Sequence, residues 1–583
     1  MPHTSQPICY TLRFPLPATH YVEVEGIIPT NEQPTIELAM AVWTPGSYLV
    51  REFARHVESV TATTPDGKPL PIDKSRKNRW CIQANGTNPV HVTYRVYGHE
   101  MSVRTNWIEA DFALLNGAPT FLTVLEEGTR PYDIKLILPD SWQTTMTGLP
   151  PVASGDPHHY CAADFDTLVD CPILAGNPAV YTFTVDGKPH FLVNVGEGGV
   201  WDGVQAVRDV EQIVRAHWRL WGGPLPYDKY LFLNMITEAS GGLEHLNSTV
   251  LMTSRWHTRT RKAYLDWLGL ASHEFFHVWN GKRLRPIELG PFDYENEVYT
   301  KSLWVVEGVT TYYTELGVRR AGLCTDAEFL ELLSGLIDRV QTTPGRLLHP
   351  LAMTSYDAWI KLYRPDENSA NTTISYYTKG AVVAFLLDAK IQTATAGAQC
   401  LDDVMRLAYT RFAGTRGFTP EDFRHTVQEV AGIDLGAWFT STLEHADELD
   451  YAEALAWFGL RFATPPPSPA KAWLGMSTKV DNGRLIVTHI PRHTPAWQAA
   501  INVDDELLAI DDYRVRPEQW ATRLEQYRPG EQVSLLVARR ERLLQLSTTF
   551  AAEPPKSWKL EVHPEATPAQ QVHFTTWLNG QDT

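Results

Sequence analysis

The N-terminal third of the chain alternates apolar and polar residues with a period of two. The alternation runs through residues 10–14 and 90–96, and such a period is typical of strands that bury one face. Turn-forming residues, among them Pro65-Asp66-Gly67, separate the strand-like runs. We therefore predict an all-β domain over residues 1–172.

From residue 173 to residue 455 the apolar positions recur at helical spacing. The pattern is clearest in residues 205–218 and 378–391, where it places the apolar side chains on one face of a helix. Thr419 and Pro420 begin a further helix, because threonine caps a helix and proline fits its first position. We predict a mostly helical domain over residues 173–455, which makes the chain a multidomain α+β protein.

A proline-rich segment at residues 465–469 separates the helical domain from a short C-terminal domain. Its prolines keep such a linker extended and stiff. Strand-like and helix-like runs then follow from residue 473 to residue 550 in the order of a bacterial-type PDZ domain, which this part of the chain resembles. We expect a PDZ-like domain with its linker over residues 456–560 and a C-terminal tail over residues 561–583.

The resemblance to PDZ domains implies a peptide-binding loop at Leu474, Gly475 and Met476. PDZ domains bind an extended peptide as an added strand and hold its carboxylate on loop amides. The glycines usual in such domains are replaced by Ala500, Asp504 and Asp512. A peptide bound in this groove and a domain that only packs against the rest of the chain are both open alternatives.

Two histidines and a glutamate form the most informative motif of the sequence. His273 and His277 stand four residues apart on a predicted helix, so their side chains lie one above the other and reach the same metal ion. This is the HExxH pattern of zinc peptidases. Glu274 then accepts the proton of a water molecule that attacks a carbonyl. On its own, the motif is also compatible with an ordinary helix that carries two histidines.

A buried carboxylate further along the chain supports the metal interpretation. Glu307 lies within the apolar run 303–313, where an unpaired carboxylate is costly to bury and is expected to meet a cation. A catalytic zinc ion takes three protein ligands and leaves one position open. We therefore predict one Zn²⁺ per chain, held by His273, His277 and Glu307.

Composition and charge exclude several other kinds of protein. The chain has 51 basic and 68 acidic residues and a net charge of -17, which argues against a nucleic-acid or anionic-membrane partner. Its six cysteines lack CxxC spacing, as in proteins that keep their thiols reduced. Neither a signal peptide nor an apolar run of about 20 residues is visible. We expect a cytoplasmic protein, or a periplasmic or secreted one if a leader precedes this sequence.

The motifs and their surroundings resemble the glycyl aminopeptidase family of gluzincin zinc metallopeptidases. The likeness is carried by residues 273–280, 282–286, 292–294 and 303–308, and by Trp43-Thr44-Pro45-Gly46-Ser47-Tyr48 near the N-terminus. It implies a thermolysin-like catalytic domain with zinc between two lobes. It also implies removal of a small N-terminal residue, glycine or alanine, from peptides.

The same resemblance assigns residues that bind the substrate. Gly241, Gly242 and Glu244 stand where related aminopeptidases carry a strip that pairs with the peptide backbone and binds its free α-amine. His245 stands where those relatives often have asparagine. A structural turn is the alternative for this strip.

Tyr377 is the expected stabiliser of the reaction's oxyanion, since it precedes Thr378-Lys379-Gly380 as in similar aminopeptidases. A phenol aimed at the oxyanion stabilises the transition state by a hydrogen bond. Tyr376 is the alternative. Thermolysin-like enzymes can place an aspartate four residues after the third ligand, but this chain has Thr311 there, so the groups that orient the two histidines are not predicted.

The sequence therefore predicts a zinc-dependent aminopeptidase that hydrolyses the N-terminal bond of peptides with a free amine. One alternative is a zinc endopeptidase with the same site, in which Glu244 only lines an open cleft. Another is a PDZ peptide-binding scaffold with a vestigial metal site. The intact set of His273, Glu274, His277 and Glu307 argues against a vestigial site.

Overall fold

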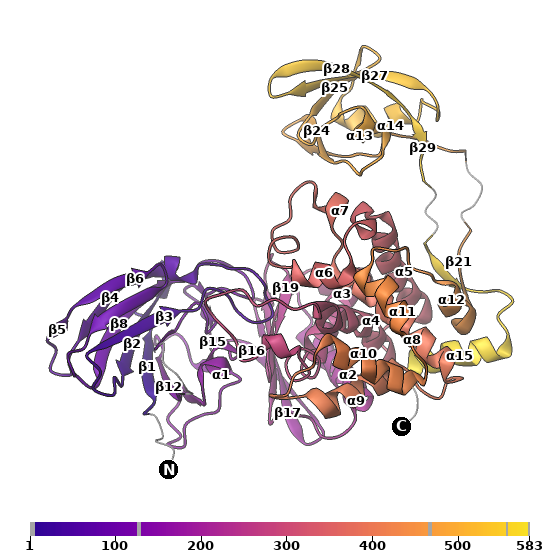
Figure 1. Cartoon of the computed structure of the whole chain (residues 1–583). Coiled ribbons are helices and arrows are strands. Elements are labelled where there is room, and N and C mark those ends of the chain that lie inside the picture. Colours follow the sequence, from indigo (N-terminus) through magenta and orange to yellow (C-terminus); the bar gives the residue numbers. More distant parts are fainter. Residues whose placement is uncertain (1–5, 125–129, 465–468, 555–557, 581–583) are drawn as a thin grey trace.

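The computed structural model describes residues 6–124, 130–464, 469–554 and 558–580. An N-terminal β part lies beside a central part in which helices cover a five-stranded sheet, and a smaller C-terminal β part lies above the central part in Figure 1. The chain is thus a mixed α/β multidomain protein with an all-β N-terminal domain and a helical middle region, as predicted. No helix within the described residues is long and apolar enough to cross a bilayer.

Three sheets build the N-terminal part, with strand orders β14-β12-β1-β2-β8-β4-β5, β11-β3-β7-β6 and β13-β15-β10-β9. Alternate residues of β2 and β8 are buried, so the period of two reflects a one-sided core. The last strand, β15, pairs with β10 and extends this part to Gly176, beyond the boundary drawn at residue 172. The elements are β1 (Ile8–Arg13), β2 (Tyr21–Ile28), β3 (Thr35–Met40), β4 (Val57–Thr63), β5 (Pro69–Leu70), β6 (Ile72–Arg76), β7 (Arg79–Gln83), β8 (Val90–Tyr97), β9 (Trp107–Ile108), β10 (Phe112–Leu115), β11 (Leu122–Val124), β12 (Tyr132–Ile137), β13 (Thr144–Thr147), β14 (His159–Ala162), α1 (Phe165–Val169) and β15 (Ile173–Gly176).

The sheet of the central part has the strand order β16-β17-β18-β20-β19. β18 is buried along its whole length, whereas β19 lies at the edge and pairs only with β20. The elements are β16 (Ala179–Val185), β17 (Lys188–Val195), α2 (Gly203–Trp221), β18 (Tyr230–Ile236), β19 (Gly241–Glu244), β20 (Ser248–Thr253), α3 (Arg261–Phe276), a π-helical segment (Trp304–Val309), α4 (Thr310–Arg320), α5 (Asp326–Thr342), α6 (Leu351–Tyr356), α7 (Ser369–Thr372), α8 (Tyr376–Ala394), α9 (Leu401–Phe412), α10 (Pro420–Ala431), α11 (Gly436–Phe439), a second π-helical segment (Thr440–Glu444), α12 (Ala452–Phe458) and β21 (Leu460–Phe462).

A small apolar core joins the N-terminal part to the central sheet. Leu114 of β10 and Leu174 of β15 pack with Val193, Leu233 and Val250 of the central strands. All five side chains are fully buried. Burial of this kind stabilises the junction by the hydrophobic effect, so that loops of the N-terminal part are held against the central sheet.

The C-terminal part contains a six-stranded sheet of order β23-β24-β25-β27-β28, with β26 paired to β25. Leu474, Gly475 and Met476 directly precede its edge strand β23, and the Leu474 carbonyl accepts a hydrogen bond from the Ala496 amide at 2.8 Å. The likeness of this part to PDZ domains stays a prediction. The elements are β22 (Ala472–Trp473), β23 (Ser477–Asp481), β24 (Arg484–His489), α13 (Pro495–Gln498), β25 (Glu506–Ile510), β26 (Tyr513–Arg514), α14 (Trp520–Leu524), β27 (Gln532–Arg539), β28 (Arg542–Thr549) and β29 (Ala551–Ala552).

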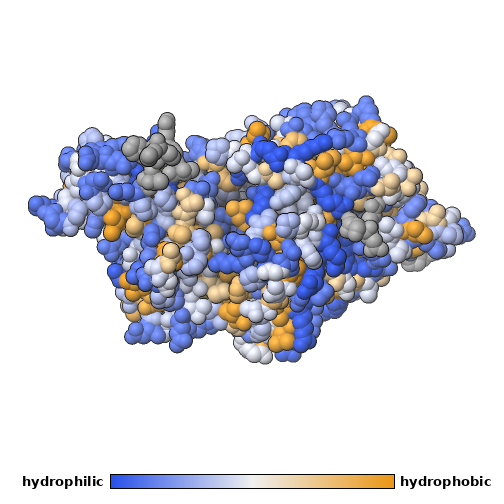
Figure 2. Space-filling model, turned by 90° about the horizontal axis from the view of Figure 1, so that it is seen from below, coloured by the Kyte–Doolittle hydropathy of each residue, from blue (hydrophilic) through white to orange (hydrophobic). Residues whose placement is uncertain are grey.

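The segment expected to be a tail is instead part of the central fold. Its first strand, β30 (Leu560–Val562), pairs with β21, and α15 (Pro568–Asn579) follows. Thr567 caps α15, and Phe574, Trp577 and Leu578 are buried in the central core. The proline-rich linker falls largely on residues 465–468, which lie outside the described residues. Seen from below, hydrophilic residues dominate the surface and hydrophobic ones form small separate groups (Figure 2), which is typical of a surface exposed to water.

Candidate metal centre and active site

The two histidines of the HExxH motif lie at the C-terminal end of α3. Thr260 caps the first turn of this helix, and His273 and His277 follow one another on the face turned toward the π-helical segment. Their Nε2 atoms are 3.2 Å apart. The four-residue spacing therefore places both rings at one point, as a shared metal ion requires.

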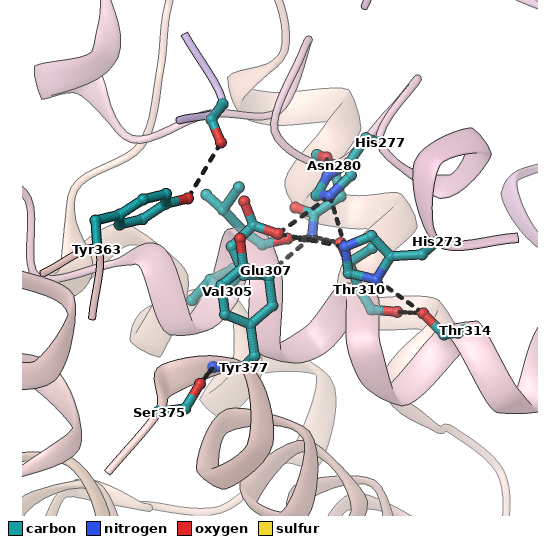
Figure 3. A network of polar contacts seen from close by, with 12 residues as sticks. His273, His277, Asn280, Val305, Glu307, Thr310, Thr314, Tyr363, Ser375 and Tyr377 are labelled. Atoms are coloured by element: carbon teal, nitrogen blue, oxygen red, sulfur yellow. Dashed lines mark hydrogen bonds and ion pairs between the residues drawn. The ribbon is translucent and has the colours of Figure 1, made fainter. Parts of the chain in front are cut away.

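Glu307 reaches the same point from the π-helical segment Trp304–Val309 (Figure 3). Its Oε2 atom lies 3.5 Å from His273 Nε2 and 3.1 Å from His277 Nε2, and the residue is 1% exposed. Tetrahedral ligands at roughly 2.0–2.1 Å from a zinc ion lie about 3.3–3.4 Å apart. The three ligand atoms thus have the spacing of a tetrahedral zinc site, and one tetrahedral position remains for a further ligand.

The outer hydrogen bonds of the histidines direct their lone pairs inward. His277 Nδ1 lies 2.8 Å from the Asn280 carbonyl oxygen, which only accepts, so Nδ1 carries the proton. His273 Nδ1 lies 2.9 Å from Thr314 Oγ1, whose own proton is donated to the Thr310 carbonyl at 2.9 Å. Both Nε2 lone pairs then face the carboxylate of Glu307. Three acceptors so close together in a buried site require a cation.

Glu274 stands beside the metal-binding atoms and is 5% exposed. Burial raises its pKa well above the usual range, and the carboxylates of Glu244 and Glu307 add to the effect while His277 opposes it. Burial also raises the pKa of Glu307, but the positive charge of protonated His277, with hydrogen bonds from both histidines, outweighs it and lowers that pKa to about 2; a metal ion at the same point would supply the positive charge in place of the protons. Glu274 thus binds a proton readily, whereas Glu307 stays ionised. This difference suits a proton carrier that lies beside an ionised ligand.

β19, the edge strand of the central sheet, forms one wall of the cleft. Gly242 lies so close to Glu274 that a Cβ on this glycine would collide with the Glu274 carboxylate. Glu244 ends the strand and brings a carboxylate oxygen within 4.8 Å of ligand atoms of Glu274 and His277. Gly241 leaves open space at the other end of the strand. The strip predicted to bind substrate therefore lies along the metal site.

The loop at residues 43–48 of the N-terminal part packs against the end of the strip at Glu244. A Cβ on Gly46 would stand 2.6 Å from Glu244 Oε1, and the φ angle of Gly46 is +87°. The carbonyl of Gly46 accepts a hydrogen bond from the hydroxyl of Tyr363 at 3.4 Å (Figure 3). A backbone conformation and a close approach that only glycine tolerates thus place this loop directly against Glu244.

Tyr377 lies in the first turn of α8, next to the metal-binding atoms. Its amide donates to the Oγ of Ser375 at 3.2 Å, and its ring lies 6.1 Å from that of His273. Tyr376 points into the core and is fully buried. Of the two tyrosines, Tyr377 is the one that lines the cleft. Burial raises its pKa well above the usual range, so its phenol keeps a proton to donate.

The cleft has a volume of about 380 Å³. Its lining combines the side chains at the candidate metal site, the edge strand and two residues of the N-terminal part, Gly46 and Arg104. The lining residues are Gly46, Arg104, Gly242, Glu244, Asp266, Gly269, Leu270, His273, Glu274, His277, Glu307, Thr314, Glu315 and Tyr377.

His245 faces away from the metal site. Its Nδ1 lies 3.3 Å from Asp170 Oδ1, the Leu246 amide donates to Asp170 Oδ2 at 2.7 Å, and the Lys282 ammonium lies 2.6 Å from Asp170 Oδ1. Burial raises the pKa of Asp170, but Lys282 and His245 outweigh it and lower the pKa to about 2. This aspartate therefore fixes the chain directly after Glu244.

Four contributors to the site were not predicted from the sequence. Thr314 and the Asn280 carbonyl form the outer hydrogen bonds that orient the two histidines. Arg104 and Tyr363 come from loops distant in sequence. Thr314 could have been found from the sequence, because it follows Glu307 by seven residues and so lies on the same face of the helix. The spacing of Arg104 and Tyr363 in the sequence gives no comparable indication.

Two regions of the chain match models of known protein families. Residues 9–177 match the Peptidase M61 N-terminal domain, and residues 266–383 match the M61 glycyl aminopeptidase. The search of curated proteins finds no match. A solved structure of an aminopeptidase N family protein from Idiomarina loihiensis is 28% identical, with a TM-score of 0.91 over 98% of this chain and 100% of that chain. The chain therefore resembles the M61 glycyl aminopeptidases over both regions, as its motifs predicted, and this likeness supports peptidase activity.

Proposed function

We propose that the chain is a zinc-dependent aminopeptidase that removes the first residue of peptides with a free α-amine. The spacing of the three ligand atoms of His273, His277 and Glu307, with both lone pairs turned inward, is the observation that carries the metal assignment. A zinc ion there would polarise the carbonyl of the scissile bond and lower the pKa of a water molecule. One ion per chain is expected.

The residues of the chain then divide the work of hydrolysis. Glu274 accepts a proton from the attacking water as its oxygen bonds to the carbonyl carbon, and the same proton passes to the nitrogen as the C–N bond breaks. The Tyr377 hydroxyl donates a hydrogen bond to the oxygen that gains negative charge. The raised pKa of Glu274 favours the form that carries the proton between the two transfers.

Binding of the amine follows from the end of the cleft at Glu244. A peptide that adds to the free edge of β19 in antiparallel register directs its N-terminus toward Glu244, where a carboxylate meets an ammonium. Gly46 lies against the carboxylate of Glu244 and so limits the room for further residues beyond it. The geometry therefore favours an aminopeptidase over an endopeptidase.

Two further properties rest on resemblance alone. A preference for glycine or alanine comes from the family likeness, and a peptide bound beside β23 comes from the likeness to PDZ domains. The expected partners are peptides, and nucleic acid or membrane is not among them. A cytoplasmic location stays a prediction from the sequence.

Metal analysis together with activity on alanyl amides tests the proposal. We expect one zinc ion per chain, loss of activity with a chelator and recovery on adding zinc. His273→Ala and Glu307→Ala should lose both zinc and activity. Full zinc occupancy in both variants would refute the ligand assignment.

A further inference from the structure

Two arginines of the N-terminal part lie near one another, Arg104 in the cleft lining and Arg51 beside the loop that contacts Glu244. Arg104 lines the cleft together with Gly46 and Glu244. Arg51 donates to Ser47 Oγ at 2.9 Å, in the loop that covers Glu244. The Nε atoms of both arginines are buried without a hydrogen-bond partner, and neither side chain forms an ion pair with any residue that the structure describes.

The backbone around Arg104 is held by a buried network. The Arg104 amide donates to Ser102 Oγ at 3.1 Å, and the next residue, Thr105, donates from its hydroxyl to the Glu100 carbonyl at 2.6 Å. The Thr105 carbonyl in turn accepts a hydrogen bond from Asn116 Nδ2 at 2.6 Å. The loop thus presents Arg104 from a fixed backbone, which is typical of a preorganised binding group.

The two guanidinium groups repel one another. Burial lowers the pKa of Arg51 to about 10, and the charge of Arg104 contributes in the same direction. The acidic neighbour Glu100 is bound by Arg55 at 3.0 Å instead. Arg104 acts on the carboxylate of Glu274 only at a distance, through its charge. Two partly buried cations without a direct ion-pair partner among the described residues are costly, and a bound anion would lower that cost.

The arginines lie on the amine side of the scissile bond. Glu244, which Gly46 covers, is near Glu274 and His277. Arg104 and Gly46, both of the N-terminal part, line the cleft together with this proposed amine-binding residue. A group near Arg104 therefore belongs to the first residue of the peptide rather than to the residues after the cleaved bond.

We propose that Arg104, backed by Arg51, binds a carboxylate on the side chain of the first residue. This inference rests on the proposed aminopeptidase function and refines its substrate class. Beyond small residues, the cleft then accepts aspartate or glutamate at this position and rejects lysine and arginine. The substrate ammonium offsets the charge of Glu244, and a planar guanidinium fits a carboxylate by two parallel hydrogen bonds.

Aminoacyl amides that differ only in charge test the inference. The zinc-loaded full chain is assayed on aspartyl against asparaginyl amide and on glutamyl against glutaminyl amide, with alanyl amide as the reference. We expect at least one acid to exceed its neutral isostere tenfold or more in kcat/KM. In Arg104→Gln the ratio should fall to about one, and Arg104→Lys should recover part of it.

Arg55→Gln is the matched control, since Arg55 is exposed, is paired with Glu100 and lies outside the cleft lining. Its acid-to-amide ratios should equal those of the unchanged protein. Ratios of one or below in the unchanged protein, with alanyl amide cleaved, would overturn the inference and leave the aminopeptidase proposal intact. Failure to cleave any free-amine amide would contradict the aminopeptidase proposal itself.

A measurement of ligand binding tests the role of Arg104 independently of catalytic activity. Calorimetric titration of the zinc-loaded protein with aspartate and with asparagine compares the same two side chains. We expect tighter binding of aspartate, which Arg104→Gln abolishes and Arg55→Gln retains. Equal binding of the two amino acids would contradict the assignment of Arg104.

Discussion

Gly308 and Gly380 lie so close together that a Cβ on Gly308 would stand 2.6 Å from the Cα of Gly380. The reverse distance, from a Cβ on Gly380 to the Cα of Gly308, is 2.9 Å. Gly308 directly follows Glu307 in the π-helical segment, and Gly380 lies one turn after Tyr377 in α8. The contact between the two glycines therefore brings the third metal ligand and the proposed oxyanion donor to the same side of the cleft.

Gly308→Ala should separate the two elements. A methyl group inserted between two helical backbones that touch forces them apart, at a cost of about 1–3 kcal/mol. We expect a lower melting temperature, weaker zinc binding and reduced turnover. Gly335→Ala is the control, because Gly335 lies exposed in α5 with nothing within 4 Å of a Cβ; there alanine should be neutral or stabilising. Equal behaviour of the two variants would rule out a special role for the glycine contact.

Thr314→Val should weaken zinc binding by roughly 10- to 100-fold, the usual effect of losing a group that orients a metal-binding histidine. The substitution keeps the shape of the side chain but removes the acceptor for His273 Nδ1. Competition with a chelator of known affinity measures the change. Thr311→Val on the same helix serves as the control, and an equal loss in both variants would speak against this role of Thr314.

Glu274→Gln should retain zinc and lower kcat by about 10²–10⁴-fold. Glutamine fills the same space beside Gly242 but does not carry the proton. Elemental analysis and steady-state kinetics on alanyl amide measure the two effects separately. Near-normal turnover would place the general base elsewhere.

Asp170→Asn should destabilise the protein in a pH-dependent way. The pKa of Asp170 is depressed to about 2 in the folded state, so its contribution is present above the unfolded-state pKa near 4 and is lost as the pH falls toward 2. At pH 7 we expect a loss of about 2 kcal/mol in the free energy of unfolding, shrinking between about pH 4 and pH 2. A difference from the unchanged protein that is constant over this range would contradict the assignment.

Much of the fold follows from local patterns in the sequence. The period of two in residues 90–96 corresponds to β8, and the capping threonine and proline at residues 419 and 420 begin α10. The packing of residues 561–583 into the central core was not predicted, because this segment buries few side chains. They are Phe574, Trp577 and Leu578, which lie within one short stretch. Their partners lie far away in the sequence, so only the assembled core reveals that α15 belongs to it.

The grouping of His273, His277 and Glu307 was predictable because helix geometry fixes the spacing of the two histidines and because Glu307 is a lone acid in an apolar run. The remaining groups of the cleft depend on how separate parts meet. Arg104 and Gly46 line the cleft with Glu244 because the N-terminal part packs against the central sheet. No local pattern records that packing, so the sequence could not predict it.

Glu244→Ala should impair free-amine substrates much more than acetylated ones. The carboxylate meets the substrate ammonium, so its removal should raise KM for alanyl amides and narrow their advantage over acetylated amides. Glu244→Gln keeps the shape beside Gly46 and separates loss of charge from loss of packing. A uniform fall for both kinds of substrate would assign Glu244 a structural role instead.

The most direct test of the account compares one peptide with a free amine and the same peptide with an acetylated amine, with the products identified by mass spectrometry. The account predicts stepwise release of the first residue from the free peptide and almost no cleavage of the acetylated one, because acetylation removes the cation that Glu244 binds and adds bulk where room is limited. Internal cleavage of the acetylated peptide at a comparable rate would contradict the aminopeptidase function and support an endopeptidase.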